Sequence, residues 1–258
     1  MMRNVCVSAL AAALVCASAG ATEVDQYNFT GNGNDSIGTN NATLEGGATI
    51  FANALQLNGS GQYAELPPGI LDSFTSLTIE VWFTWATNTD QTWARLFDFG
   101  SGTNSYLYLT PDVGSGWTSP GQSGFALLAP LGGSERDLQG PTITPGVETF
   151  MAITLNGSTA TMYVNGVEVA TKDIINTVAD LNSTTNNWLG QSEFANPYFD
   201  GSIDELSIYN NAQSSDAVLA DYNAGPADPI PEPGTALLLL GGLCLAAVSR
   251  AIRRRASR

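Results

Sequence analysis

The chain contains no histidine, and its only cysteines (Cys6, Cys16 and Cys244) lie near the two ends. Without histidine there is no Ser-His-Asp or Cys-His catalytic group and no histidine-ligated zinc. The body of the chain, residues 22–224, also lacks a disulfide, a thiolate nucleophile and a cysteine-ligated metal. Much of enzyme chemistry is therefore excluded.

Basic residues are scarce in the body as well. Arg95, Arg136 and Lys172 are its only cations, against 22 carboxylates. Such a surface repels the phosphate backbone of nucleic acids and anionic lipid headgroups. We therefore expect no nucleic-acid partner.

The first 21 residues have the three-part layout of a secretory signal peptide. Arg3 provides the positive start, an apolar run extends from Val5 to Cys16, and Ala19-Gly20-Ala21 supplies a small-residue cleavage site. A buried N-terminal helix is the alternative, but polar, turn-forming sequence follows at once. Residues 1–21 are therefore predicted to be a signal helix.

Residues 235–258 are predicted to form a transmembrane helix with an arginine-rich tail. The apolar run that begins at Ala236 would span about 20 Å as a helix, against the ~30 Å apolar core of a bilayer, and flanking residues lengthen it. By the positive-inside rule the cluster that follows is retained in the cytoplasm: Arg253, Arg254 and Arg255. Both ends then place the body outside the cytoplasm.

Residues 225–234 are predicted to be a linker that carries Pro231, Glu232, Pro233 and Gly234. Its two prolines hold an extended strip that lacks backbone donors. A Pro-Glu-Pro motif, a short apolar helix and a terminal arginine cluster, in this order, resemble the PEP-CTERM sorting signal of certain Gram-negative bacteria.

The PEP-CTERM resemblance implies that an exosortase-type membrane enzyme recognises the tail, cuts it, and releases or transfers the protein. The chain would cross the inner membrane, be anchored there transiently by the C-terminal helix, and reach the cell surface or the extracellular matrix. An ordinary membrane anchor is the alternative.

Short apolar runs separated by Gly, Asn, Ser and Pro predict that the body is all-β. Residues Leu77–Trp85 alternate between apolar and polar, and Asn165-Gly166 within Thr159–Thr171 predicts a type I′ hairpin. Other strands are expected at Ile50–Leu57, Gln62–Leu66, Arg95–Gly100, Tyr106–Thr110, Gly124–Leu128, Phe150–Leu155, Trp188–Gln191 and Gly201–Tyr209. Some ten strands predict a two-sheet sandwich or jelly roll over residues 22–224. One helical turn, capped by Ser215, is expected near its end.

Three strings follow one another in the body: Leu77-Thr-Ile-Glu-Val-Trp-Phe83, Leu155–Gly166 with its Tyr-Val-Asn-Gly end, and Phe199-Asp-Gly-Ser-Ile-Asp-Glu-Leu-Ser-Ile-Tyr209. This succession resembles the laminin-G-like domain, in its bacterial LamG_3-type form, of the concanavalin A-like lectin/glucanase superfamily. The resemblance implies a concanavalin A-like jelly-roll β-sandwich. Because this fold serves lectins, adhesion modules and hydrolases alike, it leaves the function open.

Glycosidases of this fold carry a Glu-x-Asp-x-(x)-Glu run, and the sequence has none. Glu135-Arg-Asp137 lacks a third carboxylate, and Asp204 and Glu205 are adjacent, so on a strand they point to opposite faces. We therefore predict no catalytic residues.

Asp204 is the candidate metal ligand. On the predicted strand it shares a face with Leu206 and Ile208, where a carboxylate must be paired, hydrogen-bonded or metal-bound. The laminin-G-like resemblance implies a structural calcium ion, with Asp204 as the first candidate ligand and Asp35 as the second. Hydrogen bonds from loop amides to Asp204 are the alternative.

Tryptophans are the candidate sugar-stacking residues. Trp85 and Trp188 are predicted to lie in the core, whereas Trp93 and Trp117 lie in predicted loops. We predict a non-catalytic surface or matrix protein that binds polysaccharide or another surface component. A purely structural surface protein without a ligand is the alternative, and a polysaccharide-degrading enzyme is the third possibility.

Overall fold

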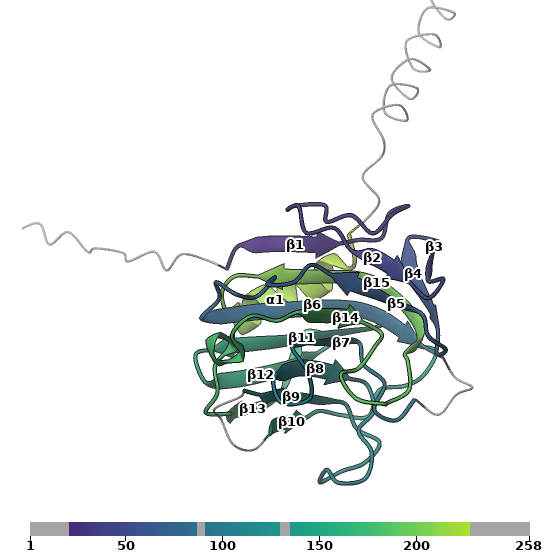
Figure 1. The fold of residues 1–258 in the computed structure, drawn as a ribbon. Coiled ribbons are helices and arrows are strands. Elements are labelled where there is room, and N and C mark those ends of the chain that lie inside the picture. Colours follow the sequence, from purple (N-terminus) through teal and green to yellow (C-terminus); the bar gives the residue numbers. More distant parts are fainter. Residues whose placement is uncertain (1–20, 87–90, 130–134, 228–258) are drawn as a thin grey trace, which may run out of the picture.

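Two antiparallel sheets pack face to face in the computed structural model, which describes residues 21–86, 91–129 and 135–227 (Figure 1). One sheet has the order β13-β12-β11-β6-β15-β4-β3, with β1 also paired to β15, and the other has the order β10-β9-β8-β7-β14-β5-β2. The strands are β1 (Glu23–Tyr27), β2 (Thr43–Glu45), β3 (Thr49–Phe51), β4 (Ala54–Asn58), β5 (Tyr63–Leu66), β6 (Ser76–Trp85), β7 (Phe97–Gly100), β8 (Tyr106–Thr110), β9 (Gly124–Leu128), β10 (Arg136–Gln139), β11 (Thr149–Asn156), β12 (Thr159–Val164), β13 (Val167–Asp173), β14 (Asn186–Leu189) and β15 (Asp200–Tyr209). A 3-10 helix, η1 (Val178–Leu181), precedes β14. The predicted all-β sandwich is confirmed.

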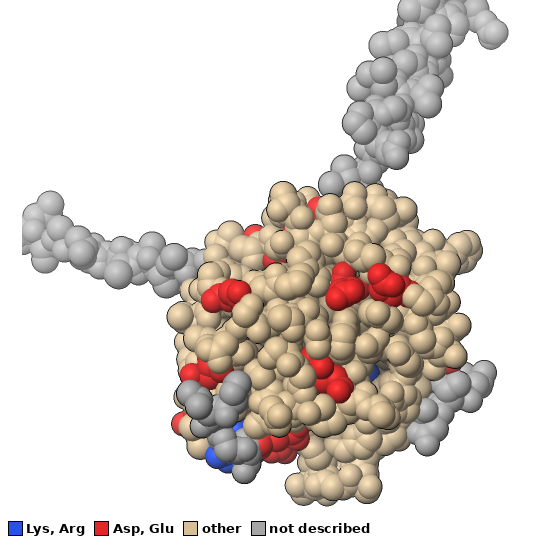
Figure 2. Space-filling view, viewed as in Figure 1, with Lys and Arg blue, Asp and Glu red and all other residues tan. Residues whose placement is uncertain are grey.

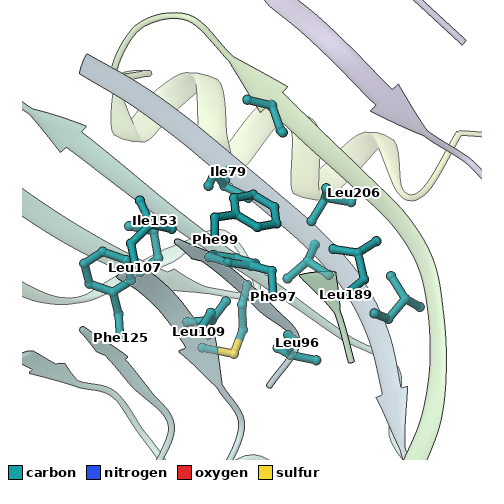
Figure 3. Packing of buried hydrophobic residues seen from close by; sticks show 14 of the residues in the cluster. Ile79, Leu96, Phe97, Phe99, Leu107, Leu109, Phe125, Ile153, Leu189 and Leu206 are labelled. Carbon is teal, nitrogen blue, oxygen red and sulfur yellow. The ribbon is translucent and has the colours of Figure 1, made fainter. Parts of the chain in front are cut away.

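The core lies between the two sheets. Every second residue of β6, beginning with Leu77 and ending with Trp85, belongs to the main cluster of buried hydrophobic residues, as the alternation predicts. Figure 3 shows Phe97 and Phe99 of β7 among side chains of the opposite sheet, including Ile79 and Leu206. The other face of each sheet points away from this core.

Two hairpins show where the turn signals succeed and fail. Asn165 and Gly166 join β12 to β13 with φ of 49° and 74°, as a type I′ turn requires. The single strand predicted over Ile50–Leu57 is wrong, because Ala52 and Asn53 adopt φ of 52° and 60° and fold it into the β3–β4 hairpin.

A β-bulge in β15 alters the predicted faces around Asp204. Ile203 pairs with Phe83 and Glu205 pairs with Trp82, so Asp204 is the extra residue between them. Ile203 therefore lies in the core, and Glu205 lies on the outer face. The simple alternation predicted for this strand is wrong at this point.

The one α-helix of the described chain, α1 (Ser215–Ala224), covers the outer face of the eight-stranded sheet (Figure 1). Its N-cap is Ser214, one residue earlier than predicted, and it runs for ten residues rather than a single turn. Tyr222 stacks on Trp82 of β6, with ring centroids 5.6 Å apart.

Both ends of the folded body lie against β15. The Thr22 amide donates to Asn210 Oδ1 at 3.1 Å, and the Asn210 amide donates to the Thr22 carbonyl at 3.0 Å. The Ala227 amide donates to Glu205 Oε2 at 2.6 Å. One strand thus holds the start and the end of the sandwich.

The predicted signal helix and transmembrane helix fall on residues 1–20 and 228–258, outside the described residues. Across the parts that are described, no helix is long and apolar enough to cross a membrane.

Candidate ligand-binding site

Aromatic side chains cover part of the outer face of the seven-stranded sheet. Strand alternation along β8 sends Leu107 and Leu109 into the core and leaves Tyr106 and Tyr108 outside. The two tyrosine rings stack with centroids 5.7 Å apart. On β9, Tyr108 pairs with the small Ala126 and Tyr106 pairs with Leu128, and both partners belong to the same cluster on this face.

Two loop tryptophans meet above Tyr108. The rings of Trp93 and Trp117 lie edge to face, with centroids 5.6 Å apart and planes at 76°. Two glycines make room for them. A Cβ on Gly114 would lie 2.3 Å from Trp93 Nε1, and a Cβ on Gly124 would lie 2.6 Å from the Trp117 ring.

Arg95 lies beneath these rings and is only 2% exposed. Its guanidinium carbon is 3.5 Å from the centroid of the Tyr108 ring, a cation–π contact. Its Nη1 donates to the Trp93 carbonyl at 3.0 Å, and its Nε is 3.5 Å from Asp98 Oδ2. The sequence alone did not indicate Arg95 as a residue of a binding site. Its role could have been suspected because it is one of only three cations in the body and stands directly before an apolar strand.

Asp98 completes a buried ion pair. Burial raises the pKa of Asp98 to about 7, while the Arg95 guanidinium acts in the opposite direction. Asp98 Oδ2 also accepts the Glu193 amide at 3.0 Å. This pairing fixes Arg95 under the tyrosine and the tryptophans.

These groups enclose a cavity of about 260 Å³, here called the aromatic pocket. It is lined by Trp93, Arg95, Tyr108, Gly116, Trp117, Glu135, Phe194 and Asn196. Glu135 accepts a hydrogen bond from the Tyr106 hydroxyl. Ring faces beside a carboxylate and an amide are the groups that bind the apolar faces and the hydroxyls of a sugar.

Trp188 begins a second aromatic strip on the same face. Leu189 enters the core and Trp188 points outward, half-buried, with its ring 6.2 Å from that of Tyr63. Tyr198 lies 6.3 Å from Tyr63. The core position predicted for Trp188 is therefore wrong, whereas Trp85 lies in the core as predicted.

Asp35, the second calcium candidate, accepts hydrogen bonds from backbone amides of β1 and of its own loop. Its Oδ1 accepts the amides of Gln26, Ile37 and Gly38, and its Oδ2 accepts that of Asn40. Burial acts to raise the pKa of Asp35, but the amides of Gly38, Gln26 and Ile37 outweigh it and lower that pKa below its usual value. With both oxygens bonded to backbone, Asp35 is poorly suited to hold a metal ion.

Asp204, the first candidate, fits a cation better. Its Oδ2 is buried and has no hydrogen-bond partner. Burial, with the nearby Glu148 charge, raises the pKa of Asp204 to about 6. Nowhere in the described chain, however, do three or more carboxylates form a group that could hold a metal ion. Calcium binding at Asp204 stays a prediction.

The sorting residues Pro231, Glu232, Pro233 and Gly234, like the arginines at 253–255, lie outside the described residues. The acidic character of the body is visible in Figure 2, where carboxylates are spread over the face in view and basic side chains are few.

Comparison with models of known families shows to which family the chain belongs. The Laminin_G_3 model, which describes the concanavalin A-like lectin/glucanases superfamily, matches residues 58–219. The chain belongs to this family. A second model, for the PEP-CTERM protein-sorting motif, matches residues 229–255. Both resemblances seen in the sequence are thereby confirmed, and a sorting motif joined to a concanavalin A-like domain indicates an exported surface protein.

Solved structures share the sandwich of this family. Domain 4 of AbnA, a GH43 extracellular arabinanase from Geobacillus stearothermophilus, in complex with arabinotriose, has a TM-score of 0.65 at 23% identity, over 78% of this chain and 98% of that one. The binding domain of botulinum neurotoxin serotype D/C has a TM-score of 0.62 at 15% identity, over 78% and 52%. At these identities the likeness shows the fold alone. No curated protein sequence matches the chain.

Proposed function

We propose that the protein is a non-catalytic carbohydrate-binding protein of the cell surface or matrix, and that the aromatic pocket is its glycan site. The observation that carries this proposal is the convergence of Trp93, Tyr108 and Trp117 on one cavity with Glu135 and Asn196 at its wall. Sugars bind to such sites through their C–H faces and their hydroxyls.

The charge of the body favours a neutral glycan. Of the residues that the structure describes, Arg95 is the only cation that lines the aromatic pocket, and Asp98 already pairs with it. Glu135 adds a further carboxylate to the wall. The negative charge of the body would repel an anionic saccharide, whereas it would not weaken the binding of a neutral one. The solved arabinanase domain of the same fold, in complex with a neutral trisaccharide, supports this choice.

The sorting motif supports processing by an exosortase-type enzyme at the inner membrane. Replacing Pro231, Glu232 and Pro233 by alanine and following size and location by blotting tests it. We expect the variant to keep its tail and to stay with the membrane, and a product identical to the native one would refute exosortase processing.

A glycan array tests the carbohydrate-binding proposal. We expect binding to neutral oligosaccharides, lost in Trp117→Ala and kept in a matched control, Phe51→Ala. Phe51 is 74% exposed on β3 of the other sheet, so its removal changes an aromatic surface residue without touching the pocket. Equal, flat signals for all glycans would refute glycan binding and favour the alternative, a purely structural surface protein without a ligand. Release of reducing ends from the polysaccharide of the host would instead establish an enzyme.

A further inference from the structure

A second cavity lies on the outer face of the other sheet, beside α1. It has a volume of about 270 Å³ and is here called the acidic pocket. Four carboxylates from four elements line it, together with Gln26, Trp82, Tyr209 and residues 224–227: Glu23 of β1, Glu80 of β6, Glu205 of β15 and Asp221 of α1.

Glu80 is the centre of this cluster. It is only 4% exposed, and its Oε1 accepts no hydrogen bond. A buried carboxylate oxygen without a partner is costly, so Glu80 is poised for a donor that enters the cavity. Glu23 Oε1 is also buried without a hydrogen bond.

The other two carboxylates are held in place by the fold. Glu205 accepts the Ala227 amide at 2.6 Å and the Ser207 hydroxyl at 3.2 Å. Asp221 accepts the Gln213 side-chain amide at 2.8 Å. Each donor is neutral, so these hydrogen bonds do not compensate the negative charge of Glu205 or Asp221.

Among the described residues, none that lines the acidic pocket is basic. Arg95 pairs with Asp98 and Lys172 with Asp137, and Arg136 begins β10 of the opposite sheet. The described part of the chain therefore supplies no positive charge to pair with these carboxylates.

We propose that the acidic pocket binds a small organic cation that carries one or more primary ammonium groups. A single metal ion is disfavoured because, over the ranges that the structure describes, three carboxylates do not form a group that could hold one. Ammonium groups separated by a carbon framework reach separated carboxylates instead, and each has three donors for them. The volume is just below the range of about 300–1,000 Å³ typical of ligand pockets, which suits an amine or one amino sugar.

Titration calorimetry of the full chain tests this site with two sources of the same chemistry, spermidine and glucosamine. N-acetylglucosamine is the matched neutral ligand, and calcium chloride tests a metal. We expect heat with at least one ammonium ligand and none with N-acetylglucosamine. The arm that binds identifies the source as a free polyamine or an amino sugar.

Variants connect the heat to the cavity. Glu80→Gln and Glu205→Gln should weaken binding about tenfold or more, because neither amide can form an ion pair with an ammonium group, whereas Glu80 can release its proton when the cation enters. Glu23→Gln, at a less buried position, serves if either variant fails to fold. Glu168→Gln, on exposed β13, makes the same charge change elsewhere and should bind as the native chain does. No ammonium binding, equal binding by all variants, or binding of calcium alone would overturn the proposal.

Discussion

Glu80→Gln should make the sandwich more stable, and by an amount that grows with pH. In the folded chain, burial and the charges of Asp221, Glu205 and Glu23 raise the pKa of Glu80 from 4.5 to about 9. The folded state therefore holds a proton that the unfolded state releases between these two values. Stability is greatest below the lower pKa and falls as pH rises toward the upper one.

One proton of difference changes the free energy of unfolding by about 1 to 2 kcal/mol per pH unit. Glutamine resembles the protonated acid and cannot ionise. Near pH 5 the native chain and the variant should therefore differ little, and at pH 7 the variant should be more stable by about 3 kcal/mol.

Urea unfolding at pH 5, 6, 7 and 8, followed by tryptophan fluorescence, measures this difference. Glu168→Gln controls for the loss of one surface charge. A Glu80→Gln advantage that stays constant across this range, or that shrinks with rising pH, would refute the reasoning. It would mean that Glu80 is already ionised in the folded chain.

Three further predictions concern the other sites. Arg95→Ala should lower the free energy of unfolding by about 3–5 kcal/mol because Asp98 is left buried and unpaired, and a double variant with Asp98→Leu should recover part of the loss in urea unfolding. Gly124→Ala places a Cβ 2.4 Å from Val113 Cγ1 and 2.6 Å from the Trp117 ring, so it should displace both side chains, shift the Trp117 fluorescence to the red and weaken glycan binding. An unchanged spectrum would contradict the close approach of Trp117 to Gly124. If Asp204 holds calcium, EGTA should lower the Tm of the native chain but not that of Asp204→Asn. The absence of any shift would rule out a structural calcium ion.

The fold followed from the sequence where local chemistry determines the backbone. Alternation in β6 and the Asn165-Gly166 turn each carry their signal within a few residues. β1 was missed because Glu23–Tyr27 is mostly polar and becomes a strand only through its pairing with β15. The β3–β4 hairpin was missed because its turn uses Ala52 and Asn53, neither of them glycine.

The sites were less predictable because they depend on contacts distant in sequence. Trp93 and Trp117 were singled out as loop residues, but nothing local shows that they meet over Tyr108. The bulge at Asp204 puts Ile203 in the core while Glu205 lies on the outer face in the acidic pocket, and such a change of face has no signature in the strand itself. Both cavities are formed by contacts between residues distant in the sequence, which residue type alone does not predict.

The two ends of the sandwich lie along the same strand, and this has a consequence for protein engineering. Thr22 meets Asn210, the residue directly after β15, and Ala227 meets Glu205 of β15. Asn210 and Glu205 are five positions apart, or about 17 Å at the rise of a strand. A short flexible linker spans that gap. The sandwich is therefore suited to circular permutation, and to insertion as a cassette into a surface loop of a host protein.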